Sequence, residues 1–261
     1  MAKEKLPGIK LFDLSGKNAI VTGGYRGLGL AMAEGLASAG ANIAIVSRNK
    51  ADGLKAALQI EKNYGVKAIA IGADVSIEEH TLNMAQIAID TFGTIDILIN
   101  NAGISVRGPI EEVSVEDFRR VMDVNVTGVW LCTKALVPHM KANKNGRIIN
   151  TGSTLGLVRY TDRSGYIASK GAVVTITKGL ALEVAPWNIY VNAICPGPFL
   201  TEMSKPTANL PAANKMIKDS TAVERWGDLR EIQGMAIYLA SDAATYPVGA
   251  AISVDGGWVA K

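Results

Sequence analysis

The sequence contains few of the residues that form covalent or metal cross-links. Its 261 residues include two cysteines and two histidines. Cys132 and Cys195 do not provide a disulfide framework, and they lack the spacing of metal ligands. His80 and His139 are isolated in the sequence, so we expect no metal site. Reduced thiols are typical of the cytoplasm, which is the expected location of the chain.

Long apolar runs and clustered charges are also missing. No run approaches the length of a membrane span, and the N-terminal residues lack the apolar core of a signal peptide. The net charge is +3, with basic residues scattered along the chain, so binding to nucleic acid or a membrane is not expected. Hydrophobic residues make up 48% and charged residues 20%, a composition typical of soluble globular proteins.

The sequence is rich in a regular alternation of short apolar runs and helical patterns. Runs such as "IAIV" and "ILIN" are apolar at successive positions, as in strands buried on both faces of a parallel sheet. The expected strands are Asn18–Thr22, Asn42–Ser47, Lys67–Ala73, Ile95–Asn100, Arg147–Thr151, Tyr190–Ile194 and Ala251–Val254. The expected helices are Leu28–Ala39, Leu54–Asn63, Ile77–Thr91, Val126–Asn143, Ala168–Ala185 and Leu229–Ala240.

This alternation predicts an α/β fold of the doubly wound Rossmann type. Each strand–helix–strand unit places a helix on one face, so we expect a seven-stranded parallel sheet with helices on both faces. No interior linker or repeat divides the chain, and one domain over residues 1–261 is the preferred interpretation. The stretch from Pro198 to Asp219 holds three prolines and no strand pattern. We interpret it as a loop with a short helix, a candidate substrate lid.

Four glycines lie where the first expected strand meets the first helix: Gly23, Gly24, Gly27 and Gly29. Glycine weakens both kinds of element, so this junction needs bare backbone. Ligands of open α/β sheets bind at the carboxyl ends of the strands, and a helix N-terminus offers unpaired N–H groups that suit phosphate. The spacing is T-G-x-x-x-G-x-G rather than G-x-G-x-x-G. A purely structural turn is the alternative for this stretch taken alone.

Three further motifs follow in the chain: "NNAG" at Asn100–Gly103, "YIASK" at Tyr166–Lys170, and "PG" at Pro196–Gly197. Together with the glycine turn and the "ISVDGGW" ending, they resemble the short-chain dehydrogenase/reductase family over nearly the whole chain. The resemblance implies an NAD(P)-dependent oxidoreductase acting on a CH–OH group. It also implies that the cofactor is bound by Gly23, Tyr25, Arg26, Gly27, Leu28, Gly29, Ser47, Arg48, Asp74, Val75, Asn101, Ala102, Gly103, Tyr166, Lys170, Pro196, Gly197, Phe199 and Thr201.

Within that resemblance, the glycines surround the pyrophosphate, Asp74 bonds the adenine and Asn101 supports the adenine side. The alternative for Asp74 is a place in the N-terminal cap region of a helix. The second strand ends in "IAIVSRN", with Ser47 where an NAD site usually has an acidic residue and Arg48 beside it. Arg48, with Arg26 in the glycine turn, suits a 2′-phosphate, so the expected cofactor is NADP(H). The alternative is that both arginines are solvated surface residues.

Tyr166 and Lys170 are four residues apart, which places both side chains on one face of a helix. A tyrosine pKa near 10 is too high for easy proton exchange at neutral pH, and a nearby ammonium lowers it. This pair predicts a general acid–base, although most Y-x-x-x-K pairs are simply exposed. The resemblance adds Ser153, which would hold the substrate carbonyl oxygen, and Asn125, which would anchor a water on a proton relay to Lys170.

The resemblance implies further roles beside the nicotinamide. Lys170 would also hold its ribose, and Thr201 would hold the carboxamide. For Asn125 the alternative is a polar residue that bends a helix. The intact set of Asn125, Ser153, Tyr166 and Lys170 argues against a non-catalytic NADP(H)-binding sensor, which is the alternative from another class of protein.

Three arginines near the expected substrate wall suggest an anionic substrate: Arg107, Arg159 and Arg163. Their alternative is three solvated surface charges. Within the family, "AVERWGD" and "PGPFLTEM" resemble gluconate 5-dehydrogenases and related polyol or sugar-acid enzymes, and also 3-oxoacyl-carrier-protein reductases. We rank a sugar acid, polyol or other hydroxy-ketone first. The resemblance further implies a homotetramer, with helices Val126–Asn143 and Ala168–Ala185 on one two-fold axis and Leu229–Ala240 with the last strand on another.

Overall fold

The computed structural model describes residues 7–158, 160–202, 204, 208 and 210–261. Its centre is a seven-stranded sheet in the order β3-β2-β1-β4-β5-β6-β7, with every neighbouring pair parallel, which confirms the predicted architecture. The strands are β1 Asn18–Thr22, β2 Asn42–Ser47, β3 Ala68–Gly72, β4 Ile97–Asn100, β5 Gly146–Thr151, β6 Ile189–Pro196 and β7 Ala251–Val254. The strand order reverses between β1 and β4, where such sheets bind ligands.

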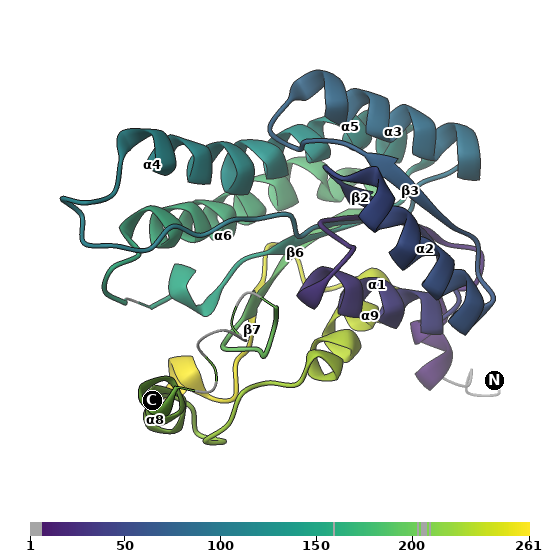
Figure 1. Cartoon of the computed structure of the whole chain (residues 1–261). Coiled ribbons are helices and arrows are strands. Elements are labelled where there is room, and N and C mark those ends of the chain that lie inside the picture. Colours follow the sequence, from purple (N-terminus) through teal and green to yellow (C-terminus); the bar gives the residue numbers. More distant parts are fainter. Residues whose placement is uncertain (1–6, 159, 203, 205–207, 209) are drawn as a thin grey trace.

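Helices cover both faces of the sheet (Figure 1). They are α1 Gly27–Ser38, α2 Lys50–Tyr64, α3 Glu78–Phe92, α4 Val115–Met122, α5 Gly128–Asn143, α6 Ser164–Val184, α8 Pro211–Ser220 and α9 Gln233–Ala240. One buried cluster packs α1, α2 and α9 against one face. The other packs α3, α5 and α6 against the opposite face.

The two clusters follow from the alternation of side chains along the strands. Ile20 and Leu98 are paired in register and point to the face of α3, α5 and α6. Val21 and Ile99, one position later, point to the face of α1 and α9. All four side chains are fully buried. A strand that is apolar at every position can therefore bury both faces, as the apolar runs predicted.

The expected element boundaries differ from the observed ones in physically understandable ways. Helix α2 begins at Lys50 rather than Leu54, because Asn49 caps it by accepting a hydrogen bond from the N–H of Ala51 at 3.1 Å. Helix α4 was not expected at all. Its apolar residues Val115, Phe118 and Val121 follow the spacing of one helix face, but the helix is only eight residues long and Val121 alone is buried.

The segment from Pro198 to Asp219 contains α8 and no described strand, in line with the loop and short helix expected there. Its base is tied by a parallel bridge between Phe199 and Gly227, supported by the hydrogen bond from Gly227 N to Pro198 O at 2.9 Å. Arg159 lies outside the described residues. Among the residues that are described, no helix has both the length and the apolar character to cross a membrane.

Candidate active site

The glycine turn joins β1 to α1 through conformations that other residues rarely adopt. Gly23 has φ +63° and Gly27 has φ +55°, both in the left-handed region. Gly29 is required for a different reason, because a Cβ there would overlap the carbonyl oxygen of Gly23 and the side chain of Asn101. The turn therefore brings the first turn of α1 directly over the end of β1. Leu30 N bonds back to Arg26 O at 3.2 Å, and the N–H groups before it in α1 have no backbone acceptor among the described residues.

Asn101 connects the ends of β1 and β4 at the point where the strand order reverses. Its side-chain nitrogen donates to Thr22 O at 3.0 Å and to Gly23 O at 3.2 Å. In return, the Thr22 hydroxyl accepts the N–H groups of Asn101 at 2.9 Å and Ala102 at 3.1 Å. Asn101 thus holds the glycine turn in place as well as lining the site.

A cavity of about 440 Å³ opens along the carboxyl ends of six strands, from β3 to β6 in the order of the sheet. It brings together most of the residues selected from the sequence. Those that line it are Gly23, Tyr25, Arg26, Gly27, Leu28, Gly29, Ser47, Arg48, Asp74, Val75, Asn101, Ala102, Gly103, Ser153, Arg163, Tyr166, Lys170, Pro196, Gly197 and Thr201.

The end of the cavity near β2 and β3 carries both charge and internal hydrogen bonds. Ser47 is buried and its hydroxyl donates to Asn49 O at 2.7 Å, so the chain already uses that proton. Arg48 is exposed beside Asp74. Burial raises the pKa of Asp74, but the two hydrogen bonds from Ser76 and the charges of Arg48 and His80 outweigh it, so the pKa lies below its usual value. Asp74 combines a place in the cavity with the turn that precedes α3.

The cavity suits a nicotinamide dinucleotide in shape and in polarity. The glycine turn lines the cavity at the N-terminus of α1, where unpaired N–H groups suit a pyrophosphate. Two buried hydroxyl oxygens that line the cavity, Ser105 Oγ and Thr151 Oγ1, have no hydrogen-bond partner among the described residues. Buried polar groups are normally satisfied, so these two await a ligand or solvent.

Ser153, Tyr166 and Lys170 meet at the other end of the cavity. Ser153 follows β5, and its hydroxyl caps a short 3₁₀ turn by accepting from Leu155 N at 3.1 Å. Tyr166 and Lys170 both lie in the first two turns of α6, and the Lys170 ammonium is 5.8 Å from the centre of the Tyr166 ring. The predicted common face of the helix is therefore present.

The electrostatics of this end differ from the simple expectation. Burial raises the pKa of Tyr166, while the Ser153 hydroxyl and the Arg163 charge act to lower it. Burial also lowers the pKa of Lys170 to about 8, although its ammonium donates to Thr151 O at 2.7 Å. Because Lys170 is buried, its positive charge is costly in the protein without bound ligand. The cation that lowers the pKa of the Tyr166 phenol is Arg163.

Asn125 is fully buried and lies beside the cavity rather than in its lining. It belongs to a π-helical turn, Asp123–Thr127, inserted between α4 and α5. Its amide accepts from Ile104 N at 2.8 Å, and donates to Ile104 O at 2.9 Å and to Ser169 Oγ at 3.0 Å. Such widened turns often occur at functional sites, and this one aims Asn125 at the loop after β4.

Phe199 and the arginines show where side chains depart from the expected lining. Phe199 is 6% exposed and its ring packs against Gly227, so it anchors the base of the 198–219 segment instead of lining the main cavity. Thr201, two residues later, does line it. Arg163 is half-buried at the N-terminus of α6, whereas Arg107 is exposed. Burial lowers the pKa of Arg163, and the charge of Arg107 lowers it further.

Sequence reasoning missed several residues of the lining: Val46, Ala73, Ile104, Ser105, Val124, Thr151, Gly152 and Glu202. Thr151 is the last residue of an expected strand, so it could have been predicted from the rule that ligands bind at the carboxyl ends of strands. Ile104 and Ser105 directly follow "NNAG". Among the described residues, no group of three His, Cys, Asp or Glu side chains is placed to hold a metal ion.

Comparison with known proteins gives this geometry a family. Residues 17–210 match the model of the short chain dehydrogenase family. The chain is 36% identical over 253 residues to 2-dehydro-3-deoxy-D-gluconate 5-dehydrogenase of Formosa agariphila, covering 97% of this chain and 96% of that protein. It is 38% identical over 250 residues to 5-keto-D-gluconate 5-reductase of Escherichia coli K12, covering 95% and 97%.

A solved structure is similar over the same extent. The gluconate 5-dehydrogenase of Burkholderia cenocepacia, in complex with NADP and tartrate, has a TM-score of 0.93 and 35% identity, covering 97% of this chain and 99% of that one. The chain therefore belongs to the short chain dehydrogenase family. It is an NAD(P)-dependent oxidoreductase that acts on a CH–OH group of a small molecule, and its relatives include gluconate 5-dehydrogenases.

Proposed function

We propose that this chain interconverts the keto and hydroxy forms of a sugar acid, with NADP(H) as cofactor. The observation that carries the proposal is a single cavity lined by the glycine turn, by Ser153, Tyr166 and Lys170, and by the half-buried Arg163. The cofactor end offers Arg48 and Arg26 in place of an acidic residue after β2, which favours a 2′-phosphate. The names of the sugar-acid relatives, and the NADP complex of one structural neighbour, support both parts.

The proposed chemistry divides between cofactor and chain. When bound, the reduced nicotinamide supplies a hydride to the carbonyl carbon of the substrate. Ser153 and Tyr166 donate hydrogen bonds to the carbonyl oxygen as negative charge develops there, and the Tyr166 phenol gives up its proton to that oxygen. Lys170 holds positive charge beside the phenol. Asn125, fixed by Ile104 and Ser169, orders the path by which the proton is replaced.

Arg163 is the residue proposed to select the substrate class. It lines the catalytic end of the cavity, and its charge is partly desolvated. Arg107 brings a second guanidinium near it, on a loop tied to residue 162 by the hydrogen bond from Gly108 N to Asp162 O at 3.1 Å. Two like charges at one rim favour an anion between them, and a guanidinium binds a carboxylate with two parallel hydrogen bonds.

The test compares 5-keto-D-gluconate with a neutral ketose, with NADPH and NADH, in wild type and Arg163→Met. We expect kcat/KM to favour NADPH and the keto-acid. Because hydrogen bonds to charged groups contribute about 1.5–3 kcal/mol, the variant should raise KM for the keto-acid about ten- to a hundredfold and leave KM for the neutral ketose nearly unchanged. Any change in kcat that follows from the pKa of Tyr166 should be shared by both substrates. Faster reduction of a 3-oxoacyl thioester would favour a carrier-protein reductase, and NADPH binding without any turnover would favour a sensor.

A further inference from the structure

Arg163 contacts the ring of Tyr160, and Tyr160 in turn contacts α8 in the 198–219 segment. Its guanidinium carbon lies 5.7 Å from the centre of the Tyr160 ring, a distance at which a cation is attracted to the face of an aromatic ring. Tyr160 is 38% exposed and, in the described part of the chain, is not among the residues that line the cavity. The contact is therefore made with Arg163 and not with the reacting centre.

Two segments that are distant in sequence hold this ring. The Tyr160 hydroxyl donates to Met216 Sδ of α8 at 2.8 Å, and its ring lies 6.3 Å from the ring of Trp258 with the planes tilted by 54°. Such tilted pairs are the favoured arrangement of aromatic side chains. Figure 1 shows α8 beside the C-terminal end of the chain. There the Lys261 ammonium donates to the carbonyl oxygens of Asp219 at 3.1 Å and Thr221 at 3.2 Å, at the C-terminal end of α8.

An arginine in this position gains from such support, because its side chain is long, its charge is partly desolvated and the Arg107 charge opposes it. We propose that Tyr160 is a positioning residue that holds Arg163 at the cavity, and that α8 and the segment around Trp258 hold Tyr160. The inference rests on the proposed function, because Arg163 is there the ligand of the substrate carboxylate. It makes α8 and Trp258 indirect determinants of the preference for anionic substrates.

The experiment compares Tyr160→Leu, which removes the ring, with Tyr160→Phe, which keeps the ring and loses the contact with Met216. Tyr160→Leu should raise KM for 5-keto-D-gluconate about two- to thirtyfold, the range of a cation–π contact, with kcat unchanged and the neutral ketose unaffected. Tyr160→Phe should raise the same KM by a smaller factor than Tyr160→Leu, because its ring stays beside Arg163 but is no longer held by Met216 of α8. Phe92→Leu is a matched control, since it breaks a comparable contact with Lys67 at 5.3 Å, remote from the cavity.

A double variant separates positioning from a general structural effect. In the Arg163→Met background, Tyr160→Leu should add nothing to KM, because there is no guanidinium left to hold. Direct binding of D-gluconate to the NADP-loaded protein, measured by calorimetry, should show the same order of affinities as the kinetics. NADPH affinity, measured by fluorescence, should be unchanged in every variant and also reports that each has folded.

The outcomes distinguish this inference from the proposed function. If wild type does not prefer the keto-acid, or Arg163→Met affects both substrates equally, the proposed function fails. If Arg163→Met is selective but Tyr160→Leu alters both substrates equally, or adds its full effect in the double variant, only the positioning role is overturned. Should Tyr160→Leu fail to fold, Trp258→Leu takes its place. We then expect a smaller rise in KM for the keto-acid alone, and an equal effect on both substrates would overturn the positioning role.

Discussion

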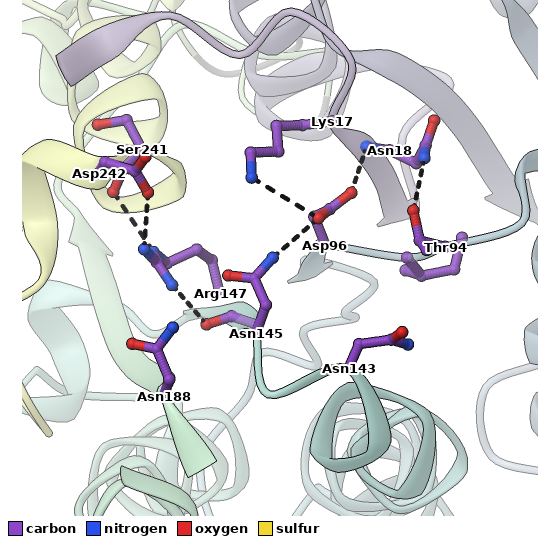
Figure 2. Close-up of polar contacts among 12 residues, drawn as sticks. Lys17, Asn18, Thr94, Asp96, Asn143, Asn145, Arg147, Asn188, Ser241 and Asp242 are labelled. Atoms are coloured by element: carbon purple, nitrogen blue, oxygen red, sulfur yellow. Dashed lines mark hydrogen bonds and ion pairs between the residues drawn. The ribbon is translucent and has the colours of Figure 1, made fainter. Parts of the chain in front are cut away.

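The two ends of the parallel sheet treat their polar groups in opposite ways. At the amino ends of the strands the chain satisfies its own groups (Figure 2). The carboxylate of Asp96, just before β4, accepts from Asn18 N at 3.0 Å and from Asn145 Nδ2 at 2.8 Å, and lies 3.8 Å from the Lys17 ammonium. Asn18 in turn accepts from Asn42 Nδ2 at 3.0 Å, so the Asp96 carboxylate and the asparagine side chains join the starts of β5, β4, β1 and β2.

A buried arginine completes that amino-terminal network. Arg147 of β5 is 4% exposed and donates to Ser241 O at 3.3 Å, to Gly146 O at 3.1 Å and to Asp242 Oδ1 at 3.0 Å. At the carboxyl ends, by contrast, Ser105 and Thr151 keep hydroxyl oxygens without partners among the described residues, and Lys170 is buried as a cation whose pKa is lowered. The amino end is built for stability, whereas the carboxyl end keeps polar groups ready for a ligand at some cost to stability.

The sharpest test of this contrast is Tyr166→Phe at the carboxyl end. Removing the phenolic oxygen takes away the proposed proton donor, so the rate of ketone reduction should fall by at least about 10²-fold, the usual scale of general acid–base catalysis. Unfolding temperature and NADPH affinity should stay close to wild type. Measurement of kcat, thermal unfolding and cofactor fluorescence checks all three, and near wild-type turnover would remove Tyr166 from the mechanism.

The matching change at the amino end is Arg147→Met. It keeps much of the side-chain bulk but takes this donor away from two buried acceptors, Ser241 O and Gly146 O, so the free energy of unfolding should fall by about 1–3 kcal/mol. Its kcat/KM should not change, because the residue lies at the amino ends of the strands and the cavity lies at their carboxyl ends. Denaturant unfolding with steady-state kinetics provides the test. Asp242→Asn is the control and should cost less, since that carboxylate side chain is 62% exposed. A large loss of activity in folded Arg147→Met would contradict the division between the two ends.

The smallest expected effect concerns Lys170 and pH. Burial lowers its pKa to about 8 from an ordinary value of 10.5. Below pH 8 the ammonium is charged in both the folded and unfolded states, and the folded chain bears the full cost of burying it. Between pH 8 and 10.5 the folded chain releases this proton while the unfolded chain keeps it, so the contribution of Lys170 to stability becomes more favourable as pH rises.

Lys170→Met lacks this titration, so any stability advantage it has over wild type should be greatest below pH 8 and shrink towards pH 10. The lost hydrogen bond to Thr151 O offsets part of the gain. Thermal unfolding of both proteins across this pH range measures the difference. A difference that does not vary with pH would show that burial of the charge is not costly here.

Particular residues show how far the sequence alone could lead. The all-apolar runs around Ile20 and Ile99 were sufficient to predict a parallel sheet, because burial on both faces leaves a direct trace in composition. Tyr166 and Lys170 were predictable from helical spacing. The order of the strands places their carboxyl ends together, which is why so many of the selected residues line one cavity.

Other features depend on contacts that no local pattern records. Phe199 was expected at the cofactor, but its ring packs on Gly227, a partner far along the chain. Arg147 lay inside a strand with no sign of its distant acceptors near Ser241. Helix α4, by contrast, was predictable, because Val115, Phe118 and Val121 recur at helical spacing. Likewise, residue spacing predicted that Lys170 would lower the pKa of Tyr166, whereas burial, which depends on the whole fold, raises it.

The π-helical turn around Asn125 has a consequence for how this region can change length. A π turn contains one residue more than an α turn, so α4, the turn and α5 behave as one helix carrying a single insertion. Deleting one residue there would restore regular winding but rotate α4 by about 100° relative to α5, since successive residues of an α-helix are separated by that angle. Phe118 would then leave its contact beside Gly165 at the start of α6. The number of residues between Val115 and Gly128 is therefore under a constraint of its own, independent of which residues they are.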